Sequence, residues 1–477
     1  MSKHSTSKKI NIAVLIACIL LVLSCFTHKH LYFDEAHYIM ASKGVTQVNL
    51  NQYDSLRTIT SAALDKENTF SNVYTQGLYN IALHYYTGIF GRSLMVHLSL
   101  SVLIGILILI AFYRLSTLYF GDSIYTSLCL VFFCTNMVIF NMMYDVTPYI
   151  FSVFCVVMSA IYFYKYRYLS SCSANLFLLG LWSAFGIMTH LFVPYIVAVY
   201  LFVLIRREKG AFFRRQNLIP LLAPVVLLCL FYGPQALFLI KYTSDYHVHA
   251  TNTHLNITLS AYDAFQLFLK SVAINFKVIF PLFKDTLAIR ISSFLLVLLI
   301  YIAGVKMLAT DKEEQKKYRT LFALGIISCL FLAPLAALTN NKLLFSFRYY
   351  AFSIPFCCIF ITIFIRGIFG AKKLGIAYKV LVPVLLVLPG LYEFVANRLH
   401  TTIIPNNYVA TTEHIRETDT HQIGVPTAMD AVFINSLLPA GYGATYHVDP
   451  QSTDFVLYKK DGTERIPAIN HDIVLLY

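Results

Sequence analysis

The chain has 477 residues, of which 58% are hydrophobic and only 13% are charged, and its formal net charge is +13. Soluble domains carry about 25% charged residues, so this composition excludes a soluble enzyme and predicts a protein with many membrane spans. In such a protein basic residues collect in cytoplasmic loops, and no basic stretch here has the interleaved aromatic residues of a nucleic-acid site. We therefore expect no nucleic-acid partner.

Apolar runs long enough for membrane helices recur along most of the chain. A helix of about 20 residues crosses the roughly 30 Å hydrocarbon core of a bilayer. The run from Ala174 to Ile205 is too long for one straight span and is broken near Thr189 and Pro194, so it predicts two spans. The sequence thus predicts a polytopic α-helical membrane protein with about eleven spans. The predicted spans are residues 10–27, 93–113, 123–141, 147–164, 174–190, 192–205, 218–240, 287–306, 320–338, 349–365 and 380–396.

The predicted connections differ in charge between the two sides of the membrane. Those on the side of the N-terminus hold twenty Lys and Arg residues, whereas the short connections on the other side hold two, Lys342 and Arg348. By the positive-inside rule the N-terminus is cytoplasmic, and an odd number of spans places the C-terminus outside. The first run is longer than a signal-peptide core, so we expect it to stay as an anchor. We expect a plasma membrane or bacterial inner membrane location.

The first long outer segment, residues 28–92, predicts short interfacial helices. Tyr74, Leu78, Ile81, Ala82 and Tyr85 recur at intervals of three and four residues. This spacing is typical of an amphipathic helix that lies on a membrane or on other helices.

Two further outer segments are long, residues 241–286 and the polar tail. In the tail, residues 454–458 and 472–476 read as buried strands and residues 426–438 as a helix, which predicts a small α/β domain. The expected domains are residues 1–396, a transmembrane domain, and residues 397–477, an extracytoplasmic α/β domain.

An acidic pair, Asp34 and Glu35, follows the first span and is followed in turn by His37 and Tyr38. Ionisable residues near membrane depth are costly and mark functional places. An ionised carboxylate there can accept the proton of an attacking hydroxyl. The pair could equally begin an interfacial helix, since acids favour helix N-termini. Asp34, Glu35 and His37 would also suit a divalent cation, although nothing fixes a coordination number.

Other ionisable residues fall at the predicted outer ends of spans. Arginine suits a phosphate because its planar group donates two parallel hydrogen bonds, but it can also anchor a helix end. For the histidines and the aspartate the alternative is a polar group satisfied within the core. Together they indicate a reaction at the outer interface between a water-soluble group and a lipid-borne phosphate. These residues are His97, Asp145, His190, Arg290 and Arg348.

The stretch Phe33-Asp34-Glu35-Ala36-His37-Tyr38 resembles the first-loop motif of GT-C glycosyltransferases. It is most similar to that of protein O-mannosyltransferases and bacterial lipid A aminoarabinose transferases. The resemblance covers roughly residues 10–396, and further short matches follow in the family's order. The further matches are Ile89-Phe90-Gly91-Arg92-Ser93, Tyr144-Asp145-Val146-Thr147-Pro148-Tyr149, Thr189-His190, and Phe347-Arg348-Tyr349-Tyr350 with Pro355 after it.

The resemblance implies a GT-C-like fold and an inverting transfer on the extracytoplasmic face. The donor would be a polyprenyl-phosphate sugar, a hexose or pentose, and the acceptor a hydroxyl of a lipid, glycan or protein. It implies that Asp34 is the general base, with Glu35 beside it, and that Arg348 binds the departing phosphate. The other substrate-binding candidates are His37, Tyr38, Asp145, His190, Arg290 and Tyr349.

The sequence also departs from the family's pattern. Residues 75–79 read Thr-Gln-Gly-Leu-Tyr where many members carry His-Pro-Pro before Leu-Tyr, and His97 stands where an Arg is frequent. The arginine of the turn between the third and fourth spans is absent, with Asp145 nearby. These departures concern the acceptor and phosphate contacts more than the class of donor.

Two other classes stay open. A secondary transporter would place ionisable residues and broken helices near the membrane centre, whereas here the charges lie at one edge. A non-catalytic scaffold that displays the tail does not require an acidic pair beside the membrane. An enzyme is therefore our expectation.

Overall fold

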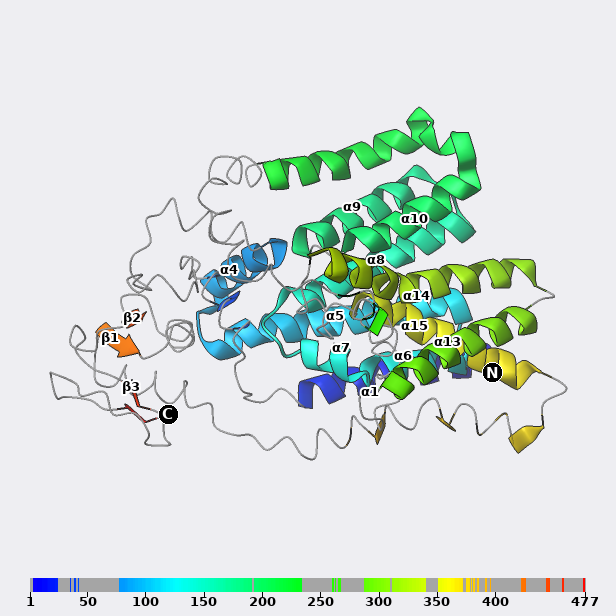
Figure 1. The fold of residues 1–477 in the computed structure, drawn as a ribbon, viewed down its shortest axis with the longest axis horizontal. Coiled ribbons are helices and arrows are strands. Elements are labelled where there is room, and N and C mark those ends of the chain that lie inside the picture. The colour runs from blue at the N-terminus through cyan, green and yellow to red at the C-terminus, as the bar shows by residue number, and fades with distance from the viewer. Residues whose placement is uncertain are drawn as a thin grey trace. The chain divides into compact units, whose positions relative to one another are not determined.

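The fold is that of a computed structural model, drawn in Figure 1. Helices dominate the residues that the structure describes. The described residues are 3–24, 35, 38–39, 42, 77–190, 193–233, 260, 262, 265–266, 287–308, 311–339, 351–371, 375–377, 379, 381, 384–385, 391–392, 395, 422–425, 443–446, 457–458 and 475–476.

The chain divides into two compact units that are discontinuous in sequence. Helix α5, Leu94–Phe120, contributes its first residues to one unit and the rest to the other. Unit 1 comprises Met1–Cys25, Ile104–Met143 and Tyr149–Thr401, and unit 2 comprises Phe26–Leu103, Tyr144–Pro148 and Thr402–Tyr477.

Unit 1 is a bundle of apolar helices (Figure 1). Within it α6 packs against both α1 and α15, α10 packs against α9 and α14, and α13, α14 and α15 pack against one another. Its helices are α1 (Lys3–Ser24), the larger part of α5, α6 (Ile124–Cys134), α7 (Met137–Met142), α8 (Pro148–Tyr164) with a π-helical end (Lys165–Leu169), α9 (Ser173–Thr189), α10 (Val193–Glu208) with a 3-10 turn (Lys209–Phe213), an unlabelled helix Arg215–Gly233, α13 (Leu287–Met307), α14 (Lys312–Thr339) and α15 (Ile354–Gly370).

The core of unit 1 is rich in stacked aromatic rings. Phe112 of α5 stacks on Phe133 of α6 with ring centroids 4.1 Å apart. Tyr318 of α14 stacks on Phe360 of α15 at 4.4 Å, and its hydroxyl donates to the carbonyl of Ile300 at 2.9 Å. Such pairs add to the free energy gained by burial alone, and the hydroxyl is satisfied inside the apolar core.

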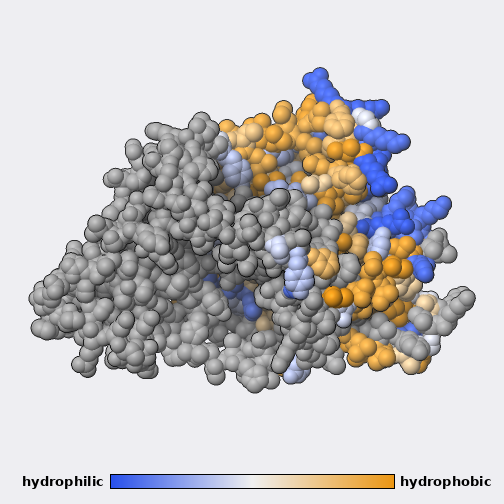
Figure 2. All heavy atoms as spheres, viewed as in Figure 1, coloured by the Kyte–Doolittle hydropathy of each residue, from blue (hydrophilic) through white to orange (hydrophobic). Residues whose placement is uncertain are grey.

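Several helices match the predicted membrane spans. Among the described residues, five helices are long and apolar enough to cross a membrane. Figure 2 shows hydrophobic residues over much of the described surface, as expected for helices that face lipid. The protein is therefore a helical membrane protein with several spans. The five helices are Thr6–Ser24, Leu94–Phe120, Pro148–Leu169, Arg215–Gly233 and Ala351–Gly370.

The predicted span 123–141 is wrong as a single helix, because the chain breaks between α6 and α7. Asn136 lies at the break, and its Oδ1 accepts hydrogen bonds from the backbone N–H groups of Val138 at 3.1 Å and Ile139 at 3.2 Å. Asparagine caps the first turn of a helix in this way, so it starts α7 anew.

Unit 2 contains helix α4, Leu78–Phe90, within the predicted first outer segment. Gly77 and Gly91 flank the helix with φ of 91° and 102°, values that side chains disfavour. The helix was predicted, and the apolar residues expected on one of its faces are partly exposed. Tyr85 of the predicted face is 63% exposed. The buried residues are instead Tyr79, Asn80, Leu83 and Thr87. The buried face is therefore more polar than the sequence pattern predicts.

The described parts of the tail form two parallel strand pairs. Strand β1 (Gln422–Val425) pairs with β2 (Gly443–Tyr446), and β3 (Leu457–Tyr458) pairs with β4 (Leu475–Leu476). The last pair falls within the two strands expected from the sequence. Parallel strands need a crossover connection. The expected α/β domain stays a prediction.

Other predictions fall largely outside the described residues. They concern the helix at 426–438, most of the outer segment 241–286 and much of the last span, 380–396. The expected division into domains at residue 396 stays a prediction.

Candidate functional site

A polar cluster in unit 2 joins four segments that are far apart in sequence. Glu35, Tyr38, Ile39 and Ser42 are helical, and in a helix this spacing places them on one face. The segment contacts residues of α4, the first turns of α5 and the turn 144–148. We call these residues the polar cluster; its side chains are Glu35, Tyr38, Ser42, Tyr79, His84, His97 and Ser101, and its backbone groups belong to Asp145 and Val146.

Glu35 ties the first outer segment to the turn before α8. Its carboxylate is fully buried, and its Oε1 accepts the backbone N–H of Val146 at 2.8 Å across 111 residues of sequence. A buried carboxylate is stable only where hydrogen bonds or charges compensate its lost hydration. The N–H group supplies one such bond. Glu35 therefore fixes the position of its own segment as well as that of the turn.

A hydrogen bond from α5 also holds the turn 144–148 in place. Ser101 donates from its Oγ to the carbonyl of Asp145 at 2.7 Å, and the same carbonyl accepts the N–H of Thr147 at 2.8 Å. Pro148 then begins α8, a position that suits its fixed φ. Asp145 is 7% exposed, so its backbone position is determined by these contacts.

Tyr79 of α4 completes a short hydrogen-bond chain. Its hydroxyl lies 3.0 Å from the Oγ of Ser101. Because the Ser101 proton goes to a carbonyl, Tyr79 must be the donor in this pair. Burial raises the pKa of Tyr79 above its ordinary value, although the bond to Ser101 opposes this, so the hydroxyl keeps its proton. The ring packs edge-on against Tyr38, with centroids 6.4 Å apart.

Replacing Tyr79 by Phe is expected to lower the free energy of unfolding by about 1 kcal/mol, because Ser101 loses a donor while the aromatic packing stays. The melting temperature of the purified protein measures this effect. Tyr85→Phe is the matched control, since that side chain is 63% exposed. Equal melting temperatures for the two variants would contradict the Tyr79–Ser101 bond.

Two histidines, His84 of α4 and His97 of α5, lie beside Ser42. His84 Nδ1 lies 2.6 Å from the Ser42 carbonyl, and His97 Nδ1 lies 2.8 Å from the Ser93 carbonyl. Since a carbonyl only accepts, both Nδ1 atoms carry a proton. His97 Nε2 is 3.5 Å from Ser42 Oγ, whose own proton goes to the Ile39 carbonyl at 2.7 Å. The His97–Ser42 contact is thus a hydrogen bond only when His97 is doubly protonated.

The structure brings together part of the predicted site. Glu35, Tyr38, His97 and the backbone of Asp145 share the polar cluster. His190 lies in unit 1, where its ring contacts Tyr149 at 4.9 Å and Phe352 at 5.2 Å. Arg290 is in the first turn of α13. The remaining candidates, Asp34, His37, Arg348 and Tyr349, lie outside the described residues.

Sequence reasoning missed Ser42, Tyr79, Ser101 and the N–H of Val146. Two signals were available, because Ser42 follows Glu35 by seven residues and Ser101 follows His97 by four, which places each pair on one helix face. The backbone N–H carries no sequence signal. Within the described residues no group of three His, Cys, Asp or Glu side chains could hold a metal ion, and Asp34 and His37 are not among them.

No protein-family model matches the sequence, and no curated protein matches it. A comparison with solved structures finds chains of similar fold at low sequence identity. One is the archaeal oligosaccharyltransferase AglB from Archaeoglobus fulgidus in complex with an inhibitory peptide and a dolichol-phosphate. It is 11% identical, the match covers 92% of this chain and 64% of that chain, and the TM-score is 0.47. This chain thus spans less than two thirds of the length of AglB.

Another is ArnT from Cupriavidus metallidurans bound to undecaprenyl phosphate. It is 12% identical, with 91% of this chain and 85% of that chain covered and a TM-score of 0.43.

Proposed function

We propose that this chain is an integral membrane glycosyltransferase that moves a sugar from a polyprenyl-phosphate donor to an acceptor hydroxyl. The observation that carries the proposal is the bond from the buried Glu35 carboxylate to Val146 N–H. It fixes Glu35, one residue of the acidic pair, within a polar cluster that includes residues of the apolar helix α5. A lipid-linked donor and a water-soluble acceptor could meet at such a place.

Asp34 is the general base in this proposal. The peptide bond keeps its Cα about 3.8 Å from that of Glu35, so fixing Glu35 also restricts Asp34. Asp34 accepts the acceptor's hydroxyl proton while the hydroxyl oxygen attacks the anomeric carbon. The bond from that carbon to the phosphate oxygen breaks, and the polyprenyl phosphate leaves with the electron pair. One displacement inverts the anomeric configuration.

The departing phosphate needs cations. Arg348 is the proposed contact, with Arg290 at the start of α13 as a second, because guanidinium groups bind phosphate by two hydrogen bonds. His37, Tyr38, Tyr349, Asp145 and His190 remain candidates for contacts with sugar or acceptor. We place the reaction on the extracytoplasmic face, as the basic loops of the opposite side indicate.

Purified full-length protein in liposomes tests this proposal. The liposomes would contain polyprenyl phosphates that each carry one sugar, a hexose in some and a pentose in others, with candidate acceptors outside. The expected result is release of free polyprenyl phosphate, detected by mass spectrometry, together with an acceptor that gains one sugar. Ion-coupled uptake of a solute without any such release would favour a transporter. Envelope glycans and lipids of a strain lacking the gene would identify the acceptor.

A further inference from the structure

The turn after α10 is closed by side-chain hydrogen bonds. Glu208, the last residue of α10, accepts at its Oε2 from the hydroxyl of Tyr166 and from the Nδ2 of Asn217, both at 3.2 Å. Asn217 belongs to the next helix, Arg215–Gly233. Glu208, the one acidic residue of this turn, therefore connects α10 and the helix Arg215–Gly233 to the π-helical end of α8.

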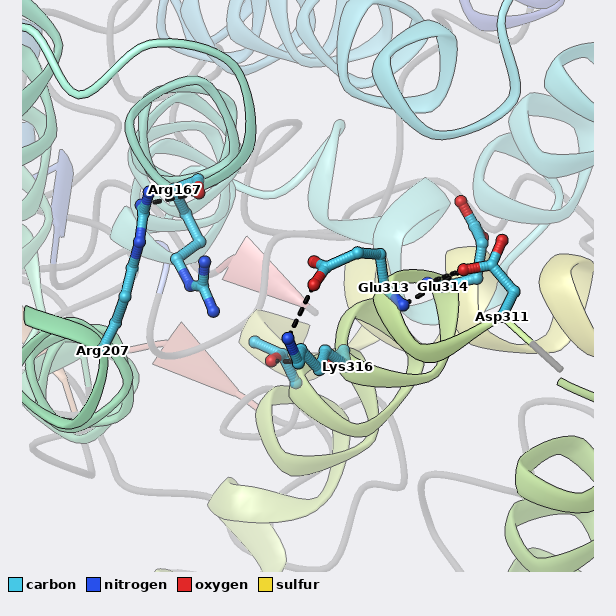
Figure 3. Close-up of polar contacts among 7 residues, drawn as sticks. Arg167, Arg207, Asp311, Glu313, Glu314 and Lys316 are labelled. Atoms are coloured by element: carbon cyan, nitrogen blue, oxygen red, sulfur yellow. Dashed lines mark hydrogen bonds and ion pairs between the residues drawn. The ribbon is translucent and has the colours of Figure 1, made fainter. Parts of the chain in front are cut away.

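Arg207 also connects α10 to the π-helical end of α8. Its Nη1 donates to the carbonyl of Arg167 at 2.6 Å and to that of Tyr166 at 3.3 Å. Figure 3 shows Arg207 extended toward Arg167. The last carbonyls of a helix lack partners within the helix, so this guanidinium satisfies two of them. At Lys209 φ is 50°, a left-handed conformation that ends α10 and starts the 3-10 turn.

Four other cations of the turn are exposed: Arg206, Lys209, Arg214 and Arg215. In the described part of the chain none of them forms an ion pair. Phe213 lies among them with 58% of its side chain exposed. Figure 2 shows hydrophilic residues at this end of the helices, beside a hydrophobic surface.

The helix that follows the turn determines how deep these cations lie in the membrane. In the apolar stretch of Arg215–Gly233 only 11% of the residues are buried. Ile219, Leu222 and Leu230 are more than half exposed. Lipid chains must cover such a surface. Nineteen residues at 1.5 Å rise span about 28 Å, which matches the hydrocarbon core. Arg214 and Arg215 at its first turn therefore lie at the level of lipid headgroups.

A second basic group in the same unit is organised differently. At the start of α14, Lys316 pairs with Glu313 at 2.6 Å, and Lys317 pairs with Glu314 at 3.2 Å. Arg366 of α15 also binds Glu314, at 2.8 Å. Figure 3 shows the first of these pairs. Each of these three cations has an acidic partner, whereas the acid in the turn after α10 binds Tyr166 and Asn217.

We propose that Arg206, Lys209, Arg214 and Arg215 form a binding site for the phosphate headgroups of anionic phospholipids in the adjoining leaflet. Clustered cations beside a membrane helix attract anionic lipids, and an exposed aromatic ring among them inserts at the interface. The site is independent of the proposed transferase reaction and uses none of its residues. Lipid bound at this site stabilises the pair of helices formed by α10 and Arg215–Gly233.

Native mass spectrometry of the full-length protein tests the site, with phosphatidylglycerol and phosphatidylcholine of identical chains as probes. Wild-type protein is expected to retain phosphatidylglycerol preferentially, and less so at high salt. The double variant R214Q/R215Q should bind it about 25-fold more weakly, since each cation near an anionic surface contributes a factor of about five. The control K312Q/K316Q removes two exposed cations from α14 and should bind as wild type does.

Three results would overturn the site. One is equal retention of the two phospholipids, and another is equal loss in both double variants. The third is undecaprenyl phosphate displacing phosphatidylglycerol at equal concentration, which would assign the cations to the polyprenyl lipid instead. The lipid-binding experiment does not measure sugar transfer. A negative result there does not contradict the proposed function, and absence of sugar transfer does not contradict the lipid site.

Discussion

Replacing Asp34 by Asn is expected to lower the rate of sugar transfer by about 10²- to 10⁴-fold, the usual contribution of a general base. Asparagine has nearly the same shape but cannot accept the acceptor's proton. The loss should appear in kcat, with the KM for the lipid donor close to that of the wild type, since the base acts in the transition state. Release of polyprenyl phosphate in liposomes measures both constants.

The matched control is Asp122→Asn, because Asp122 lies between α5 and α6, away from the acidic pair in sequence. It should transfer sugar at the wild-type rate. Both variants must be monodisperse and melt at the wild-type temperature before rates are compared. Normal transfer by folded D34N protein would remove Asp34 from the mechanism.

Replacing Glu35 by Ala is expected to damage both the fold of unit 2 and catalysis. The buried N–H of Val146 would lose its acceptor, which costs about 1–3 kcal/mol. The melting temperature should fall, and transfer should fall with it because the segment of Glu35 is no longer held against the turn. Glu35→Gln keeps an oxygen that can accept the same hydrogen bond, so this variant should recover most of the stability.

The comparison of the two Glu35 variants separates positioning from proton transfer. If the carboxylate only positions Asp34, E35Q should regain transfer along with stability. If E35Q is stable but as inactive as D34N, Glu35 takes part in proton transfer itself. Glu313→Gln, at an exposed residue of α14, is the control for loss of a carboxylate and should change neither quantity.

Local patterns in the sequence predicted much of the helical architecture. The apolar run before Asp34 corresponds to α1, and the predicted span 287–306 corresponds to α13, Leu287–Met307. Such helices follow from composition, because an apolar run in a bilayer satisfies its backbone only within itself. The break at Asn136 was missed, since the choice between a helix interior and a cap depends on one side chain's local hydrogen bonds.

The site depended more on tertiary structure. The sequence drew attention to Glu35 and Asp145, and both lie in the polar cluster, but it gave no reason to connect them. Their link is a carboxylate bound to a backbone N–H 111 residues away, and every residue has such an N–H. The contact between Tyr79 of α4 and Ser101 of α5 likewise has no signal in the sequence.

The sequence by itself determined that this is a helical membrane protein with an acidic pair beside its first span. Each helix that crosses a bilayer needs a run of about 20 apolar residues, which can be recognised locally in the sequence. Only the tertiary structure decided which polar groups meet. Hydrogen bonds between distant segments form when the chain folds, and their partners are chosen by distance and direction rather than by residue type.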